Sequence, residues 1–253
     1  MLFKLNKILS VVVLSTVFSA HAAPLTLDAG TQFGNLVYQG GLSTLTLSND
    51  LLGALDSGKV ALSPFGGAVA DVIKDVDGYY TKAAFASHVT RLTIDGGNNV
   101  LDAYSDGGST QTHPALRSVS IGGFLTLHHL WNDMETKTVH ATLEGGNGVG
   151  TITDIAVWNI GKMDGIRPMN AAGDYTSTLS QLSITSSALD AFSKSLGLLT
   201  LGKSALAGVT DFGSITSTIH VGTAAVPEPS TYAMLGIGLL GMTVLARRRR
   251  QSR

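Results

Sequence analysis

The segment Gly197 to Ser204 has the residue types and the spacing of a phosphate-binding loop, with one glycine at its start and Gly-Lys-Ser at its end. Such a loop holds a nucleotide only where it follows a buried strand and opens a helix, because its backbone N–H groups must point at the phosphates. Here a helical pattern comes before the segment, bulky apolar residues fill its centre, and the stretch from Ala205 to Gly208 is too short for a supporting helix. We therefore expect a helix that ends at Gly197, a buried strand after it, and no nucleotide site.

An acidic segment around Asp75 and Asp77 is similar to the start of a calcium-binding loop, whose ligands are mostly carboxylate oxygens. The EF-hand pattern needs further carboxylates where Ile73 and Ala84 stand, so that pattern fails. Asp71 could join the other two aspartates in an irregular calcium loop, or the three could form a turn with a solvated face. The turn is the favoured interpretation, and we predict no metal site.

Two adjacent histidines, His128 and His129, lie in a predicted strand, so their side chains should point to opposite faces of the sheet. They cannot bind one metal ion unless the strand breaks. His128 and His140 could instead meet on one face of a hairpin, which would form a metal site because imidazole is a ligand for several transition metals. A histidine on the surface or in the core is the favoured interpretation at each position.

The remaining composition excludes several chemistries. The chain has no cysteine, so it can form no disulfide, no thiolate zinc site and no iron–sulfur cluster, and it cannot use a thiol nucleophile. It also lacks the Gly-x-Ser-x-Gly and His-Glu-x-x-His patterns of hydrolases. Between residues 23 and 225 the only glutamates are Glu135 and Glu144, so a catalytic carboxylate pair would need aspartates. We predict no catalytic residue, no cofactor and no enzyme activity.

Residues 23–225 contain short segments in which polar and apolar residues alternate, and turns rich in glycine separate these segments. The alternation predicts strands at 42–48, 85–95, 121–131, 137–144, 151–160, 175–184 and 214–221. The link 132–136 is short and polar, so the strands on either side of it should form a hairpin. Strands of this length and number are typical of an all-β domain.

Only two segments have leucines at helical spacing, 49–56 and 186–196. Asn49 is the expected N-cap of the first helix, and Ser186 or Ser187 that of the second, because their side chains can accept a hydrogen bond from a free N–H group. Each helix should be short, and each follows a predicted strand.

Each helical segment also precedes the pattern Gly-Lys-x-Ala-Leu, at 58–62 and at 202–206. The two stretches are either a degenerate repeat of strand, short helix and strand, or a coincidence between similar compositions. For residues 23–225 we predict one all-β domain, a single sandwich or flattened barrel of about ten strands with two short helices.

Residues 1–22 have the pattern of a secretory signal peptide. Lys4 and Lys7 form a basic start, an apolar run follows, and Ala20 and Ala22 are the small residues that a signal peptidase requires before its cleavage site. The apolar run is too short to favour an uncleaved anchor. The exported part of the chain should therefore begin just after Ala22.

The C-terminal tail, residues 226–250, has three parts in a fixed order. These are the sequence Pro227, Glu228 and Pro229, an uncharged apolar segment at 232–246, and a basic cluster of Arg247, Arg248, Arg249 and Arg250. The prolines resist helix and sheet and leave an extended segment. The apolar segment would span about 22 Å as a helix, and the arginines can extend to the membrane surface and stay in the cytoplasm. We predict a transmembrane helix with a basic membrane stop.

This order of parts resembles the PEP-CTERM sorting signal of Gram-negative bacteria. The resemblance implies that the chain is exported, held in the inner membrane as a precursor, processed near Pro-Glu-Pro by an exosortase-type membrane protease, and released to the cell surface or the extracellular matrix. It also implies an association with exopolysaccharide. It is limited to the C-terminal tail and says nothing of the activity of residues 23–225.

Charge excludes another class of partner. Residues 23–225 keep 10 of the 17 basic residues and 17 of the 18 acidic ones, which gives a net charge of −7. An acidic domain of this kind should be soluble and has no basic surface for nucleic acid.

We therefore expect a non-enzymatic protein of the cell surface or matrix, associated with exopolysaccharide in a biofilm. The alternative is a module at the cell envelope that binds a sugar, calcium or a haem-like ligand, and a hydrolase ranks third. A binding module needs aromatic residues that converge with polar groups. The candidates, which could equally be core residues, are Tyr79, Tyr80, Tyr104, Trp131 and Trp158.

The mature chain is predicted to begin at Ala23. Leucine at both Ala20 and Ala22 should prevent cleavage, because the peptidase accepts only small residues there, and the exported protein should then keep residues 1–22. Serine at both positions is the matched control and should be cleaved as the wild type is. N-terminal sequencing of the surface form measures the outcome, and a wild-type protein that still begins at Met1 would contradict the prediction.

Overall fold

The computed structural model describes residues 23–224, Met234 and Ile237. The described part is mostly antiparallel β-sheet, with thirteen strands and three helices. The elements are β1 (Leu25–Asp28), β2 (Gln32–Phe33), β3 (Leu36–Leu47), α1 (Asn49–Ser57), β4 (Ala61–Phe65), β5 (Val69–Lys74), β6 (Tyr80–Ile94), β7 (Val100–Ser105), β8 (Gly108–Leu116), β9 (Ser120–Asp133), β10 (Thr138–Gly145), β11 (Gly150–Asp164), β12 (Gly173–Ile184), α2 (Ser186–Ser195), α3 (Thr200–Ala207) and β13 (Gly213–Thr223). The all-β prediction is confirmed, and all seven predicted strands are present.

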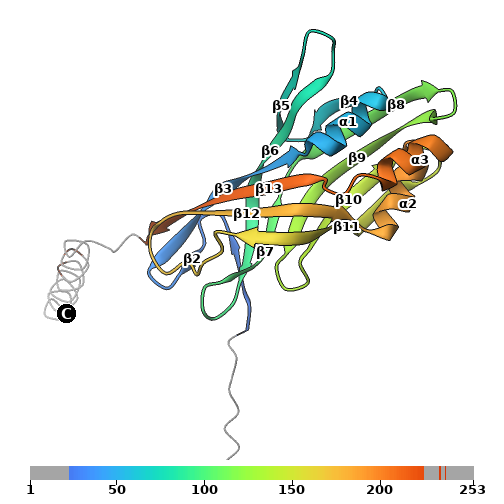
Figure 1. Cartoon of the computed structure of the whole chain (residues 1–253). Coiled ribbons are helices and arrows are strands. Elements are labelled where there is room, and N and C mark those ends of the chain that lie inside the picture. The colour runs from blue at the N-terminus through green and yellow to red at the C-terminus, as the bar shows by residue number, and fades with distance from the viewer. Residues whose placement is uncertain (1–22, 225–233, 235–236, 238–253) are drawn as a thin grey trace, which may run out of the picture.

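Eight of the strands pair in a closed ring, visible from the side in Figure 1. The order around the ring is β6, β3, β13, β12, β11, β10, β9 and β7, and β7 returns to β6. Every pair is antiparallel, including the predicted hairpin of β9 and β10. The described part therefore has thirteen strands rather than about ten, and its pairing is continuous where a sandwich would have two separate sheets.

The ring is closed over only part of its length. β7 bridges β6 and β9, but after Ser105 the chain turns at Asp106 and Gly107 and becomes β8, which pairs with β9 and β4 and not with β6. Beyond this point the first half of β6 pairs with β5 instead. The wall thus divides into two leaves, and three helices gather at the same end of the ring (Figure 1).

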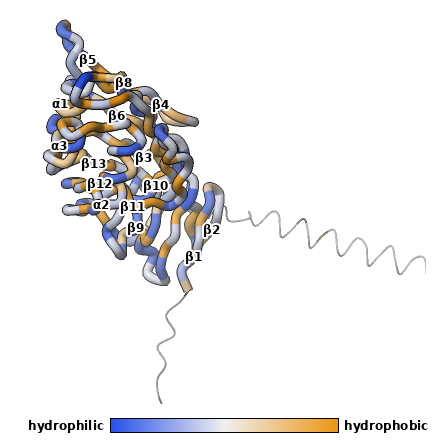
Figure 2. Tube along the Cα trace, turned by 90° about the vertical axis from the view of Figure 1, so that its right-hand side faces the viewer, coloured by the Kyte–Doolittle hydropathy of each residue, from blue (hydrophilic) through white to orange (hydrophobic). Residues whose placement is uncertain are grey.

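Two clusters of buried apolar side chains fill the interior. The larger one joins strand residues such as Leu127 and Leu143 to Leu52 of α1 and Phe192 of α2. The smaller one includes Tyr38, Leu92 and Ile94 and lies toward the other end of the ring. Figure 2 shows hydrophilic residues at the tip beside β5.

The two ends of the ring have different roles, and we name them by their contents. β1 begins beside the end of β6, with Leu25 opposite Ile94, and β13 ends beside the start of β3, with Thr223 opposite Leu36. This end is the terminal pole. The three helices form the helical pole at the other end, so the described chain enters and leaves on the side away from the helices (Figure 1).

The N-cap predictions are each wrong by one or two residues. Ser48 caps α1 and Thr185 caps α2, and each hydroxyl accepts a hydrogen bond from the N–H three residues later. The same hydroxyls donate to carbonyl oxygens on other segments, at Asp211 and Ala156 respectively. A residue at the end of a strand can make this second bond, whereas Asn49, Ser186 and Ser187 already lie inside the helices.

A third helix, α3, occupies the place where a buried strand was predicted. Only Gly202 and Leu206 of its residues are buried, and its N-cap makes no side-chain bond within the described chain, so the signals that mark a helix in sequence are weak. The two Gly-Lys-x-Ala-Leu segments also differ in structure, because 58–62 leads into β4 and 202–206 lies within α3. The third part of the proposed repeat is therefore not shared.

Loss of the Ser48 hydroxyl is predicted to destabilise the domain. Ser48→Ala removes the cap of α1 and the bond to the Asp211 carbonyl, and each loss should cost about 1 kcal/mol of unfolding free energy. Ser57→Ala is the matched control, since that exposed hydroxyl only donates to the Gly53 carbonyl one turn earlier. Thermal unfolding followed by circular dichroism measures both variants, and an equal loss in the two would contradict a capping role for Ser48.

Candidate functional site

The residues predicted for sorting lie outside the described part. They are Ala20 and Ala22 at the signal cleavage site, Pro227, Glu228 and Pro229 in the sorting signal, and Arg247, Arg248, Arg249 and Arg250 in the membrane stop. The predicted transmembrane helix at 232–246 is likewise outside it, apart from two residues. Within the residues that the structure describes, no helix has the length and apolar character needed to span a membrane.

The structure does show where the segment before the sorting signal leaves the domain. β13 ends at Thr223, and the backbone N–H of Ala224 donates to the Asn35 carbonyl at 2.9 Å. The chain is thus held at the terminal pole up to Ala224, immediately before the tail. Leu25, near the start of the described part, is held at the same pole by its pairing with Ile94.

The segment that matches a phosphate-binding loop has the wrong geometry. Helix α2 precedes it rather than a strand, and Gly202, Lys203 and Ser204 lie in the middle of α3 rather than at its start. A Cβ atom on Gly202 would come within 2.5 Å of the Val119 carbonyl oxygen, so this glycine allows α3 to pack against the chain before β9. The segment therefore lacks the order of strand, loop and helix that a phosphate-binding loop has, and the expectation of a strand after Gly197 was wrong because α3 lies there.

The acidic segment after β5 forms a turn. The Asp75 carboxylate accepts hydrogen bonds from the backbone N–H groups of Asp77 and Tyr79, at 3.0 and 2.9 Å. Asp71 forms an ion pair with Lys82, with 2.6 Å between the carboxylate and the ammonium group. Within the described residues no three histidine, aspartate or glutamate side chains are placed to hold a metal ion. The geometry agrees with the turn interpretation.

His128 and His129 do not point to opposite faces, because a β-bulge lies between them within the continuous strand β9. His129 has a φ of 50°, and the pairing of β9 with β10 shifts register between His140 and Thr142. This β-bulge turns both imidazoles toward the same side, and their Nδ1 atoms are 2.8 Å apart. The prediction that the two side chains point to opposite faces is therefore wrong.

The two imidazoles form a chain of polar contacts rather than a metal site. In this contact one Nδ1 donates a hydrogen and the other accepts it, so neither Nδ1 atom offers a free lone pair to a metal ion. The Nε2 of His128 lies 3.2 Å from Glu144, and the Nε2 of His129 lies 3.1 Å from Asp106. His140 is opposite Trp131 in the register, so His128 and His140 are not directly opposed across the hairpin, as the less favoured alternative required.

Three aromatic rings stack side by side on the outer face of the ring of strands, and we call them the aromatic strip. Tyr104 of β7, Trp131 of β9 and His140 of β10 occupy directly opposed positions. The ring centroids of Tyr104 and Trp131 are 5.4 Å apart, and those of Trp131 and His140 are 4.3 Å apart. Because β7 and β10 flank β9, both faces of the Trp131 ring are covered and the ring edges face outward.

Polar groups surround the aromatic strip. The Trp131 indole N–H donates to Asp154 at 2.9 Å, and the same carboxylate lies 3.0 Å from His140 Nδ1. Asp154 has a φ of 57° and lies where β11 shifts register against β10, so a second bulge brings this carboxylate onto the strip. The guanidinium of Arg91 lies 5.9 Å from the centre of the Tyr104 ring, which is within the range of a cation–π contact.

Two further carboxylates lie beside the strip, and their environments differ. Burial raises the pKa of Asp102, and the charges of Asp133 and Glu135 raise it further against a hydrogen bond from Thr93. Burial also acts to raise the pKa of Asp133, but hydrogen bonds from Thr136 and from the Glu135 backbone outweigh it and lower that pKa. Burial raises the pKa of Tyr104 as well.

The five aromatic candidates from the sequence separate into three groups. Tyr104 and Trp131 lie in the strip, Tyr79 is exposed beside the acidic turn, and Tyr80 and Trp158 are buried. His140 and Asp154 complete the strip and were not foreseen in it. Alternation alone could have placed His140 beside Trp131, but it gave no sign of the bulge at Asp154.

Comparison with known proteins identifies the tail alone. The family model described as the PEP-CTERM protein-sorting motif matches residues 225–250. Searches of curated proteins and of solved structures found no match. The resemblance seen in the tail residues is thereby confirmed. A motif of this kind implies a secreted protein that an exosortase, a membrane enzyme, processes and that reaches the cell surface.

The turn that Asp133 holds is predicted to weaken in acid. Its carboxylate accepts from the N–H groups of Glu135 and Thr136, both at 2.9 Å, and its pKa in the folded state is lowered. The stabilisation is therefore complete above the ordinary aspartate pKa of about 3.9 and is lost as the pH falls through the lower folded value. The wild type should melt above Asp133→Ala at pH 7, and the difference should close between about pH 4 and pH 2.

Asp77→Ala serves as the control, because that carboxylate accepts no hydrogen bond among the described residues. Its melting temperature should follow the wild type at every pH. A difference between the wild type and Asp133→Ala that is the same at pH 7 and at pH 2 would contradict the role given to this carboxylate.

Proposed function

We propose that this chain is a non-enzymatic protein of the cell surface or extracellular matrix, associated with exopolysaccharide in a biofilm. It is exported, anchored in the inner membrane as a precursor and then processed by an exosortase-type protease. The observation that carries the proposal is the PEP-CTERM motif at residues 225–250. The signal peptide at 1–22 supplies export, and residues 23–225 are the part that remains after processing.

The geometry of the described domain supports this order of events. Both chain ends leave from the terminal pole, so a precursor anchored at its tail would have that pole toward the membrane. The elements of both hydrophobic clusters lie between Leu27 and Val221. Removal of the tail would thus take away no residue of either cluster, which is what a released protein requires.

The alternative is a ligand-binding module at the cell envelope, and the aromatic strip favours its sugar form. Sugars have apolar C–H groups and hydroxyl groups, and the strip offers apolar ring edges together with the Asp154 carboxylate. Because the faces of Trp131 are covered by Tyr104 and His140, a sugar would lie across the ring edges, with its hydroxyls within reach of Asp154. An extended surface of this kind suits a polysaccharide chain better than a small ligand in a pocket.

Processing is predicted to depend on the Pro-Glu-Pro sequence. Alanine at Pro227, Glu228 and Pro229 should leave membrane insertion intact, because the apolar segment is unchanged, and should abolish cleavage. The variant should accumulate in the inner membrane at near full size. Tags placed just after the signal cleavage site and at the C-terminus of the precursor, followed by immunoblotting of membrane and surface fractions, measure the result in a host that has the sorting enzyme.

A second variant separates sorting from simple anchoring. Neutral residues at Arg247 to Arg250 should weaken retention and topology while leaving the Pro-Glu-Pro sequence in place. A plain anchor would make the triple alanine variant fractionate like the wild type, with the C-terminal tag present in both. A wild-type surface form that keeps this tag would overturn the assignment.

Polysaccharide binding, if the sugar form is right, should depend on Trp131. Trp131→Ala removes the centre of the strip and should weaken the binding of the host's own exopolysaccharide at least tenfold, as judged by affinity electrophoresis of the surface form. Tyr79→Ala is the matched control, because that ring is 58% exposed but lies outside the strip. Circular dichroism checks that both variants remain folded, and equal binding by the two would exclude the strip as the site.

A further inference from the structure

A row of serines crosses the inside of the ring between the two hydrophobic clusters. Ser217 of β13 lies opposite Ser43 of β3, and Ser43 lies opposite Ser87 of β6. All three side chains are buried, with 4–7% of their surface exposed. The interior of an eight-stranded ring is just wide enough for side chains to fill it. Polar side chains at this depth need hydrogen-bond partners.

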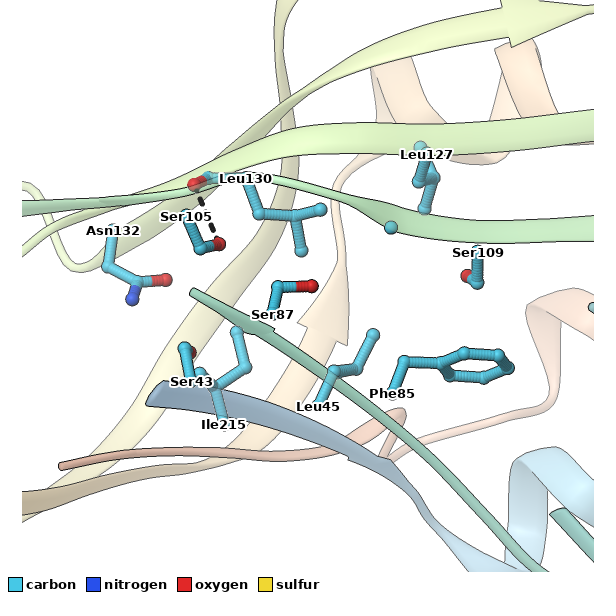
Figure 3. A pocket seen from close by; sticks show the side chains of 11 residues that line it. Ser43, Leu45, Phe85, Ser87, Ser105, Ser109, Leu127, Leu130, Asn132 and Ile215 are labelled. Atoms are coloured by element: carbon cyan, nitrogen blue, oxygen red, sulfur yellow. Dashed lines mark hydrogen bonds between the residues drawn. The ribbon is translucent and has the colours of Figure 1, made fainter. Parts of the chain in front are cut away.

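The facing wall carries further polar groups, as Figure 3 shows. Asn132 of β9 points its side chain into the space on the same side of the view as Ser105, and Ser109 lies at the other end of the cavity, near Leu127 (Figure 3). Asn132 is only 5% exposed, and its Oδ1 atom has no hydrogen-bond partner among the described residues. A buried carbonyl oxygen without a partner lowers the free energy of unfolding by about 1–3 kcal/mol. A hydrogen-bond donor beside Asn132 Oδ1 would therefore be stabilising.

The serine hydroxyls are only partly used. Ser43 and Ser217 bond each other at 3.0 Å, and Ser105 donates to the Leu130 carbonyl at 3.2 Å. The hydroxyls of Ser87 and Ser109 make no hydrogen bond to another described residue. The space between the two walls thus faces at least one free acceptor and two hydroxyl groups that can both donate and accept.

The size of the space limits what can bind there. The cavity has a volume of about 20 Å³, and a buried water needs at least about 10–15 Å³ together with two to four polar partners. We propose that the ring holds one internal water molecule at this level. The water donates to Asn132 Oδ1 and bonds the hydroxyls of serines on the two walls, so that it links strands on opposite sides of the ring.

Other occupants fit the site less well. A buried cation needs a nearby negative charge, and no carboxylate lines the cavity. A sugar or an aromatic molecule is far larger than the space. An apolar molecule would leave the Asn132 oxygen and the serine hydroxyls without partners.

The proposal is tested by a crystal structure of the full-length chain at a resolution that shows ordered water. The expected result is one water peak within hydrogen-bond distance of Asn132 Oδ1 and of at least one serine hydroxyl. Water-oxygen magnetic relaxation dispersion gives a second readout in solution, because a buried water exchanges slowly. Asn132→Leu should remove one long-lived water from that count. Asn170→Leu, which replaces an exposed amide, should leave it unchanged.

Two outcomes would overturn the proposal. One is a wild-type structure in which no water lies beside Asn132. The other is a side chain of Asn132 that bonds directly to a protein group and fills the space itself. The wild-type structure decides between these and the expected result, so the proposal remains testable even if Asn132→Leu fails to fold.

Discussion

Closure of the ring depends on one short strand, because every strand in a ring must pair on both of its edges. β7 provides the missing partner for β6 and β9, through a run of residues that ends at Ser105. It pairs with β9 only at Asp102, Ala103 and Tyr104. The rings of Tyr104 and Trp131 stack across this short junction, and cross-strand aromatic pairs stabilise a sheet where few backbone bonds are available. The aromatic strip therefore stabilises the junction that closes the ring, and it is also a candidate surface for a ligand.

The division of the wall beyond β7 explains the helices. Where β6 and β9 part, their inner faces would expose large apolar side chains such as Phe85 and Leu125 to water. The helices supply the missing cover, and Leu52 and Phe192 join the same cluster. The caps at Ser48 and Thr185 tie the starts of α1 and α2 to other segments, so the cover is fixed in place as well as packed. An exported chain without cysteine must obtain its stability from such packing and hydrogen bonding alone.

The sequence predicted the parts of this structure that have a clear apolar face. The long strands alternate because one face is buried, and all seven were found from that pattern. β5 escaped notice because its residues are mostly exposed, so Val69 to Lys74 has no alternation to detect. α3 was not predicted because only two of its residues are buried.

The positive φ angles of His129 and Asp154 follow from the pairing of distant strands, so the residues next to them in the sequence do not predict these conformations. In the candidate site, Tyr104 and Trp131 were foreseen as aromatic candidates, whereas the contribution of Asp154 depends on a bulge.

The position of β13 couples completion of the fold to the order in which the chain emerges during export. β13 is the last strand of the described part of the chain, yet it is a member of the ring between β12 and β3, and its Ser217 bonds Ser43, which lies 174 residues earlier. A chain that has been exported only as far as α3 still lacks β13. Until β13 follows, β3 and β12 each have one unpaired edge. Contacts so distant in sequence form slowly. Ala224 follows β13 directly, so the strand that completes the ring lies immediately before the sorting motif at 225–250.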